Sequence, residues 1–514
     1  MPVSALLAIL FAAQGPQPAA PVPTEVQGVW EAKALVTKGA ADPSGSGTFL
    51  EFGDTYVTDS FVAFWARTDP KPSEGWALYS WKDGKLTRLF KSWTAVAMPD
   101  SRKVLISRTE TPIHAGKSLL YFSPTLPDHV YAWDGEKFLK VLANGDEFAF
   151  RDARYTIKRA RVLDVGAGGK ALVYWDSSKQ RANGWALHDA SGFTPLWMEG
   201  DELPGIPGVR IENLSAGHGC YTGCVPPARL LEDGSVLASV KVAEAGAKRF
   251  ALYRFHQGKA EEILADSGRK AARGDEIRQR AIQLGQILAA SPQAFVMNGS
   301  VSWMTSGTML TTWTVPQFVF SDGGKVQVAD AKLERELNAI DVHSPTSLDY
   351  LLDSAILLGP ESPRALVTTR VARVSGWANT KMRSFPGLYF WDGQKLSAVA
   401  WEEALGLTIT AAEEQLLKHG HWTSVNAPLD EAVSIGLRAI PGPMGGVSVR
   451  LPLPVDAPRN WFVPADSVDG KLQPAPRFPV AGQNLTLADV LVWRGPDEAM
   501  AGTAEGFFLL KRGK

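Results

Sequence analysis

The chain lacks an excess of charge of either sign. Its 514 residues include 53 Lys and Arg against 54 Asp and Glu, a formal net charge of −1 at pH 7. Such a chain has no long-range field that would hold nucleic acid or an anionic membrane surface. With 45% apolar and only 21% charged residues, it is also too apolar for a disordered chain. We therefore expect a soluble, globular, monomeric protein without a nucleic-acid partner.

Long hydrophobic runs are absent as well, because no segment has the roughly 20 apolar residues that a transmembrane helix needs. Residues 6–13 (LLAILFAA) form a short apolar run, and a Pro-rich and Ala-rich stretch follows at 14–23. This is the layout of an export signal, although the usual positive charge before the apolar run is missing. We expect residues 1–22 to be a signal peptide and linker, and the protein to be exported to the periplasm, the cell surface or the medium. A disordered cytosolic N-terminus is the alternative.

Cysteine is scarce: only Cys220 and Cys224 occur, both in the segment GHGCYTGC. In an exported protein, a close pair in a Gly-rich loop is most simply a disulfide. The alternative is a metal or redox site that includes His218. Structural zinc normally takes four ligands, and the spacing is C-x3-C rather than the C-x-x-C of redox motifs. We therefore favour a structural disulfide and predict no cofactor from this pair.

A tight turn followed by alternating apolar residues recurs along the whole chain. From Gly168 to Asp430 the copies begin 64 to 68 residues apart, and such a period indicates repeated supersecondary units. The alternation after each turn predicts a β-strand. The copies begin at Asp59, Asp100, Gly168, Asp233, Asn298, Ser362, Asp430 and Asp489.

Aromatic-rich segments with a turn centred on Gly form a second repeated feature. Pairs such as Asp-Gly, Gln-Gly and Gly-Gly supply the positive φ angles of tight hairpin turns. Each repeat is therefore expected to hold four antiparallel strands. Trp81, Trp133, Trp185 and Trp391 lie in these hairpins, where we expect them to fill the gaps between neighbouring sheets. The hairpins span 76–90, 130–142, 185–197, 251–264, 317–329, 388–400 and 461–475.

Sheets this apolar need neighbours on both faces, and radial stacking into a β-propeller also protects their edges. The copy at Asp489 is followed by one further strand, 506–514, while 29–39 resembles an outer strand with no sheet before it. We therefore predict an all-β fold for residues 23–514: a single propeller of eight four-stranded antiparallel blades, closed by N-terminal and C-terminal strands that share a blade. Seven blades is the alternative, because Asp59 and Asp100 are only 41 residues apart.

Variable insertions lie between the outer strand of one repeat and the first strand of the next. Residues 275–288, 329–340 and 411–419 have the spacing and composition of helices. Because the insertions occupy the same position in each repeat, we expect them to share one face of the ring. Loops on a rigid scaffold are where binding sites are usually built.

The same position carries a repeated Gly-Asp-Glu tripeptide, at Gly145, Gly200 and Gly274, which is extended to GDELPG after Gly200. Together with VAFWAR (62–67) and EDGSVLASV (232–240), it resembles tandem-repeat families of secreted bacterial proteins. Their modules follow the order G-D-x-x-P-G, N-x-x-G-x-V-A-F and a Y-x-x-D-G-x-L hairpin. Leu231 stands where the family has Asn. The resemblance implies a propeller-like architecture and export, and no particular chemistry.

Two groups of residues are candidate ligand-binding sites. Asp146, Asp201 and Asp275 of the repeated tripeptide would form a ring of carboxylates that binds Ca²⁺ or a cationic ligand. The alternative, which repetition favours, is that each Asp accepts backbone hydrogen bonds and shapes a turn. His419 and His421 lie on one face of an extended segment, a spacing that metal sites use, but no further ligand lies nearby in sequence. We predict no metal site from this pair.

Catalytic motifs are absent: the chain has no nucleophile elbow, no phosphate-binding glycine loop and no H-E-x-x-H. Whether the protein is an enzyme is therefore open. We favour an exported, non-catalytic propeller that binds a protein, peptide or glycan through its inter-blade loops. The alternatives are a hydrolase or lyase with its active site at the central channel, and a purely structural cell-surface module. Polar side chains with perturbed pKa values that converge at the channel would favour the enzyme.

Overall fold

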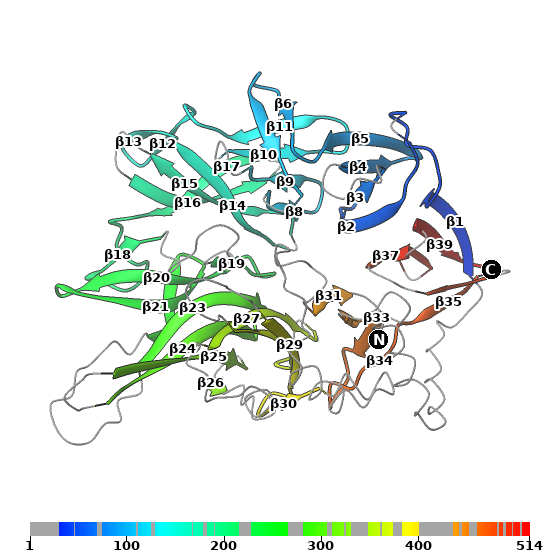
Figure 1. The fold of residues 1–514 in the computed structure, drawn as a ribbon. Helices are drawn as coiled ribbons and strands as arrows, with labels where there is room; N and C mark the ends of the chain where they lie inside the picture. The colour runs from blue at the N-terminus through cyan, green and yellow to red at the C-terminus, as the bar shows by residue number, and fades with distance from the viewer. Residues whose placement is uncertain are drawn as a thin grey trace, which may run out of the picture.

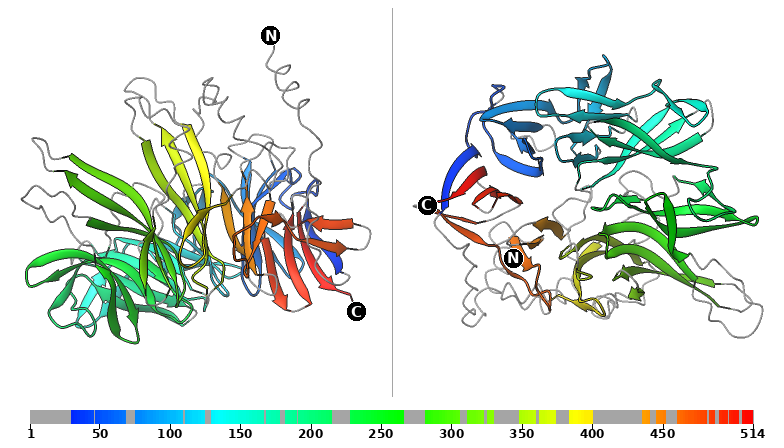
Figure 2. Two further views of the ribbon diagram at one scale, coloured as in Figure 1. Left: turned by 90° about the horizontal axis from the view of Figure 1, so that it is seen from below. Right: turned by 180° about the vertical axis from the view of Figure 1, so that it is seen from behind.

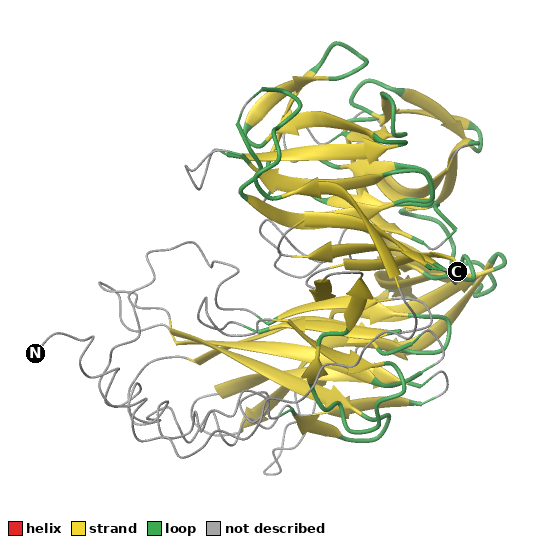
Figure 3. Ribbon diagram, turned by 90° about the vertical axis from the view of Figure 1, so that its right-hand side faces the viewer, coloured by secondary structure: helices red, strands yellow, loops and turns green. Residues whose placement is uncertain are grey.

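The chain folds into a ring of eight β-sheets around one axis (Figure 1). The structure, a computed structural model, describes residues 30–513. Its longest internal gaps are at 215–227, 266–280, 330–347, 374–382, 400–434 and 452–459, and there are shorter ones besides. The regular structure of the described residues consists of strands alone (Figure 3). The predicted all-β propeller of eight blades is therefore confirmed, and the alternative of seven blades is wrong.

The first four blades each contain an inner strand, two central strands and an outer strand. They are blade 1, β2 (Glu51–Val57), β3 (Val62–Arg67), β4 (Trp76–Lys82) and β5 (Lys85–Lys91); blade 2, β8 (Ile113–Ala115), β9 (Leu120–Phe122), β10 (Val130–Trp133) and β11 (Phe138–Leu142); blade 3, β14 (Arg159–Val165), β15 (Ala171–Ser177), β16 (Ala182–Asp189) and β17 (Gly192–Met198); and blade 4, β18 (Val209–Asn213), β19 (Ala228–Leu230), β20 (Val236–Glu244), β21 (Ala247–His256) and β22 (Lys259–Ala265). In blade 4 the inner position is divided, because β18 and β19 both pair with β20.

The remaining blades continue the same order around the ring. They are blade 5, β23 (Ala281–Ala290), β24 (Phe295–Thr305), β25 (Thr311–Ser321) and β26 (Val326–Ala329); blade 6, β27 (Leu348–Leu357), β28 (Ala365–Arg373), β29 (Arg383–Trp391) and β30 (Leu396–Ala398); blade 7, β31 (Gly436–Ile440), β32 (Gly446–Arg450), β33 (Asn460–Pro464) and β34 (Gln473–Pro474); and blade 8, β37 (Val490–Gly495), β38 (Glu498–Thr503), β39 (Gly506–Arg512) and β1 (Trp30–Thr37). The short strands β35 (Arg477–Val480) and β36 (Gln483–Thr486) extend blade 8 at its outer edge.

Blade 8 closes the ring with strands from both ends of the chain. Strand β1 pairs antiparallel with β39 from Trp30 opposite Arg512 to Thr37 opposite Gly506 (Figure 2). The predicted closure is therefore confirmed. The C-terminal part of the chain supplies three of the four strands, since β38 and β39 both follow β37. The expectation of a single strand after the copy at Asp489 was wrong.

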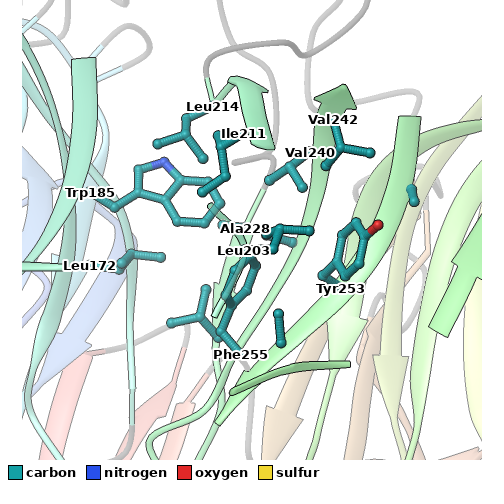
Figure 4. Packing of buried hydrophobic residues seen from close by; sticks show 14 of the residues in the cluster. Leu172, Trp185, Leu203, Ile211, Leu214, Ala228, Val240, Val242, Tyr253 and Phe255 are labelled. Carbon is teal, nitrogen blue, oxygen red and sulfur yellow. The ribbon is translucent and has the colours of Figure 1, made fainter. Parts of the chain in front are cut away.

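Hydrophobic clusters join each blade to the next. Eight separate clusters of buried residues lie at the eight blade interfaces. In Figure 4, Trp185 of blade 3 packs near Ile211 and Leu214 at the start of blade 4. The interface that seals the ring contains Phe507 of blade 8 and Phe64 of blade 1, with ring centroids 4.6 Å apart. Since both faces of every blade are covered in this way, the ring has no exposed apolar end sheet.

The predicted hairpins are the outer two strands of blades 1 to 7. In the first of them, Asp83 and Gly84 at the turn have φ angles of 49° and 84°, which is the left-handed conformation that an Asp-Gly turn provides. The Trp residues of the hairpins fill the interfaces as expected: Trp133, Trp185 and Trp391 are buried, and Trp81 packs against the cluster between blades 8 and 1.

Several of the repeated turns are not followed by the second strand of a blade. The copy at Asp100 leads into β7 (Lys103–Ile106), which pairs only with β6 (Thr94–Ala97) in a separate hairpin between blades 1 and 2. This explains the short first interval. The copies at Asp430 and Asp489 precede the inner strands β31 and β37, and Asn298 lies within β24 rather than in a turn. The Asn298 side chain instead accepts a hydrogen bond from the backbone N–H of Gln286 on the neighbouring strand.

The predicted helix at 275–288 is wrong where the structure describes it, because residues from Ala281 onward belong to β23. Two irregularities in the pairing of β23 with β24 shift its alternation. As a result the buried residues are Leu284, Ile287 and Leu288, the i, i+3, i+4 spacing of an amphipathic helix. Residue 329 ends strand β26. The rest of 329–340 and all of 411–419 lie outside the described residues.

The described insertions lie between the outer strand of one blade and the inner strand of the next. They are the hairpin β6–β7 and the hairpin of β12 (Glu147–Phe150) with β13 (Ala153–Thr156). In antiparallel blades this connection emerges on the same face of the ring each time.

Ring closure gives a direct test, in the substitution Gly506→Ala. Gly506 has φ +143°, and a Cβ atom there would overlap the carbonyl oxygen of Val36 on β1. We expect Gly506→Ala to lower the free energy of unfolding by about 2 kcal/mol or more, because strain and overlap fall on the closing strand pair. Thermal and urea unfolding would measure the change.

Gly192→Ala is the matched control, since Gly192 also has a positive φ, +124°, but open space around it. Equal losses of stability in the two variants would contradict a special role for the β1–β39 contact.

Candidate functional site

The inner strands bring residues from distant parts of the chain to the axis of the ring. From β2 through β8, β14, β19, β23, β27 and β31 to β37, each inner strand contacts the next (Figure 1). Side chains that point from these strands toward the axis can meet across intervening blades. Two groups of charged residues include side chains of the inner strands, and in one of them the contact spans an intervening blade.

The first group, the histidine cluster, consists of His114 on β8, Asp164 on β14 and Arg229 on β19. The Asp164 carboxylate accepts a hydrogen bond from the backbone N–H of Leu230 at 2.9 Å and lies 3.5 Å from the Arg229 guanidinium. Arg229 also donates to the carbonyl oxygens of Ile287 and Leu288 at 3.2 and 3.0 Å. Arg229 therefore joins blades 3, 4 and 5 on the side that faces the axis.

Burial shifts the pKa values of His114 and Asp164 in opposite directions. Burial, together with the positive charge of Arg229, lowers the pKa of His114 to about 4, so its imidazole is neutral at physiological pH. Burial raises the pKa of Asp164, although Arg229 and the Leu230 N–H partly oppose that shift. Taken as a whole residue, His114 is half-buried. A neutral imidazole presents one acceptor nitrogen and one donor nitrogen.

The second group, the arginine pair, is Arg108 and Arg438 on either side of the Asp54 carboxylate. Arg438 on β31 lies 2.7 Å from Asp54 Oδ1, and Arg108 lies 3.6 Å from Asp54 Oδ2. The Arg108 guanidinium stacks over the Trp76 ring at 4.0 Å from its centroid. Burial and the Asp54 charge raise the pKa of nearby Tyr56 well above its usual value, so that its hydroxyl stays protonated.

Irregular strand pairing helps to place both carboxylates. In β2 the register with β3 shifts between Phe52 and Thr55, the segment that contains Asp54. In β14 the register shifts between Val162 and Asp164. Bulges change the direction of side chains and are frequent near active sites.

The two described Asp residues of the repeated tripeptide lie in turns of the same geometry, and in different blades. The Asp146 carboxylate accepts from the N–H of Ala143 at 2.9 Å, and that of Asp201 from the N–H of Met198 at 3.0 Å. Each also pairs with a cation: Asp146 with Lys140 at 2.7 Å, and Asp201 with both guanidinium nitrogens of Arg151 at 2.6 and 2.8 Å. This arrangement fits the turn-shaping interpretation.

A third copy of this turn lacks the tripeptide. The backbone N–H groups of Gly145 and Gly200 donate to the carbonyl oxygens of Ile157 and Ile211. The N–H of Trp93 donates to the carbonyl oxygen of Ile106 in the equivalent turn. The φ angles are +86° and +90° at the two glycines and +62° at Trp93. A large side chain in this conformation is a backbone outlier, and Trp93 is also 48% exposed.

The other predicted site residues, Asp275, His419, His421, Cys220 and Cys224, lie outside the described residues, as does the segment 6–13. Where the structure describes the chain, no group of three or more His, Cys, Asp or Glu side chains is placed to hold a metal ion. In the same residues, no helix combines the length and apolarity needed to cross a membrane.

Comparison with known proteins adds similarity at the level of fold. The sequence matches no family model and no curated protein. The chain is similar to the β-propeller domain of the Trilobed protease from Pyrococcus furiosus, with 9% identity, TM-score 0.32 and coverage of 86% of this chain and 96% of that one. It is also similar to the polysaccharide lyase Uly1 (10% identity, TM-score 0.32, 90% and 99% coverage). A prolyl endopeptidase is similar too, at 12% identity and TM-score 0.32, with 90% of this chain and 53% of that chain covered. The class of this protein, an eight-bladed β-propeller, is defined by its own strand pairing.

The turn interpretation predicts the effect of Asp201→Ala. Asp201 is 5% exposed, and its removal leaves the Met198 N–H and the Arg151 guanidinium without their partner. We expect the free energy of unfolding to fall by about 1 to 3 kcal/mol. Added Ca²⁺ should leave the melting temperature of the unmodified protein unchanged, because a cationic side chain already occupies this carboxylate. A Ca²⁺-dependent rise that Asp201→Ala abolishes would instead support the carboxylate ring.

Proposed function

We propose that the protein is an enzyme of the hydrolase or lyase type, with its active site on the axial side of the inner strands. The observation that carries the proposal is that three neighbouring inner strands carry His114, Asp164 and Arg229, with Arg229 paired to Asp164 and its charge lowering the pKa of His114. Titratable groups with perturbed pKa values that converge from several segments are typical of active sites. This feature favours the enzyme over the non-catalytic binding protein that the sequence led us to prefer. Export, based on residues 1–22, remains part of the proposal.

The neutral His114 ring would serve as the proton acceptor. In a hydrolase it takes a proton from water, the water oxygen attacks the scissile centre, the scissile bond breaks, and the leaving group takes a proton. In a lyase it takes a proton from carbon, the released electron pair forms a C=C bond, the adjacent C–O bond breaks, and the leaving oxygen is protonated. Neither reaction needs an oxidant or a reductant. General acid–base catalysis of this kind typically contributes about 10²-fold to 10⁴-fold in rate.

His114→Gln tests the proposal on the full-length protein. A panel of neutral polysaccharides, acidic polysaccharides and peptides would be screened for new chain ends, and ultraviolet absorbance of a new C=C bond would separate a lyase from a hydrolase. We expect the unmodified protein to cleave at least one of them and His114→Gln to lose about 100-fold or more in rate. No cleavage of any substrate, or full activity of the variant, would overturn the proposal.

The pH dependence of unfolding shows whether His114 occupies the expected environment. Because burial lowers its folded-state pKa to about 4 from 6.5, its contribution to stability is present above pH 6.5 and is lost as pH falls toward 4. His114→Gln should weaken this loss while remaining folded at neutral pH. This measurement separates a missing catalytic group from a misfolded variant.

A second candidate function is binding through an inter-blade hairpin. Trp93 and Leu105 are 48% and 40% exposed; Trp93 directly precedes β6 and Leu105 is in β7, in one of the insertions between blades. A strained backbone at an exposed aromatic residue is a feature that stability alone does not favour. This observation supports a glycan or protein ligand at the β6–β7 hairpin.

Trp93→Gly separates stability from binding at this position. The two equivalent positions are glycines, so we expect the variant to gain up to about 1 kcal/mol in free energy of unfolding. Binding of the full-length protein to a glycan array and a peptide array should be lost at the same time. Val468→Ala, at a 78% exposed apolar residue elsewhere, is the control. Unchanged array signals in Trp93→Gly would exclude the hairpin as a binding site.

A further inference from the structure

We propose that Arg438 and Arg108 bind a carboxylate group of the substrate, next to the histidine cluster. This inference rests on the proposed function for its location and adds the chemical class of the substrate. It depends on the position of the arginine pair, on its charge and on the role of Asp54.

The arginine pair joins blades that are not neighbours in the ring. Asp54 belongs to blade 1 and Arg438 to blade 7, so their 2.7 Å contact spans the closing blade 8 that lies between them. Side chains can reach across an intervening blade only where they point toward the ring axis. Both side chains keep exposed surface, 38% for Asp54 and 35% for Arg438. The pair can therefore be reached by a ligand.

The arginine pair carries more positive charge than Asp54 neutralises. Two guanidinium groups face one carboxylate, and the charged groups that act on neighbouring Tyr56 are the same three: Asp54, Arg438 and Arg108. The site thus carries a surplus positive charge. Among the residues that the structure describes, Arg438 has Asp54 as its only ion-pair or hydrogen-bond partner. A guanidinium carries five N–H donors in a planar fork, and the contact with Asp54 uses one of them. The others suit the two oxygens of a second carboxylate.

The Asp54 carboxylate shows which chemical group fits between the two arginines. It is held closely by Arg438, at 2.7 Å, and loosely by Arg108, at 3.6 Å. The Arg108 guanidinium is oriented by the Trp76 ring beneath it. An incoming carboxylate would share or displace this internal one, so Asp54 should act as a competitor of the substrate.

The inner strand that carries Asp54 also neighbours the one that carries the proposed proton acceptor. Strand β2, which carries Asp54, contacts strand β8, which carries His114. A substrate whose carboxylate lies at β2 and β31 can therefore extend along the inner strands toward His114. The arginine pair would hold the anionic group and His114 would act on a neighbouring bond.

Binding measurements test this on the full-length protein, with the trimers of galacturonate and of glutamate as probes of the two sources of carboxylate. Their methyl esters are matched neutral controls. We expect at least one acid trimer to bind in isothermal titration calorimetry, more weakly as salt is added, and its ester to bind at least about tenfold less tightly. Arg438→Gln should reduce the affinity for the acid to that of the ester.

Two further variants make the result specific. Asp54→Asn should tighten binding of the acid several-fold, because it removes the internal competitor, whereas a purely structural ion pair would make both Asp54→Asn and Arg438→Gln bind less well. Arg249→Gln, which removes a 30% exposed arginine paired with Glu262 on blade 4, should have no effect.

The outcomes separate the two proposals. If neither acid trimer binds, if the esters bind equally well, or if Asp54→Asn weakens binding, the carboxylate site is wrong whatever the catalytic assays show. If the acids bind as expected, also in His114→Gln, but no substrate is cleaved, the carboxylate site stands and the proposed enzyme does not.

Discussion

Contact between neighbouring blades is the interaction on which the rest of this structure depends. A four-stranded sheet with apolar residues on both faces cannot cover either face itself, so each blade is stable only between two others. Eight clusters of buried residues meet this need, and the last of them, between Phe507 and Phe64, exists only because β1 and β39 complete blade 8. Closure is therefore a condition for covering the first and last sheets.

The same arrangement determines what the inner strands can do. Their outer neighbours and the blade interfaces contain most of the buried apolar side chains, and charged residues such as Asp54, Asp164 and Arg229 occur on the side that faces the axis. Every inner strand comes from a different part of the chain. Groups that are close at the axis, such as Asp54 and Arg438, are thus separated by 384 residues in sequence. The rigid blades supply the positional accuracy that such a site needs.

Much of the fold could be predicted from local patterns, and the axial site could not. Hairpins were visible because Asp-Gly turns and flanking aromatics are encoded within a few residues, and closure was visible because each end of the chain had an incomplete blade. The helix expected at 275–288 was wrong, since the bulges of β23 give buried Leu284, Ile287 and Leu288 a helical spacing. The pairing of Asp164 with Arg229, or of Asp54 with Arg438, leaves no local signal, because neither residue type nor spacing distinguishes these side chains from solvated ones. The tripeptide was the stronger pattern, and its carboxylates at Asp146 and Asp201 sit in turns.

The shared blade also affects the order in which the polypeptide can mature. Among the strands of the propeller, β1 is synthesised first, yet its partner β39 is synthesised last. Early blades can acquire their hairpins one after another, but the first strand must wait, unpaired, until the last strand of the propeller has been made. Closure of the ring is thus the last step in the assembly of the propeller. It also follows that a permuted gene, with the old ends fused and new ends cut between two blades, would remove that waiting period without altering any blade.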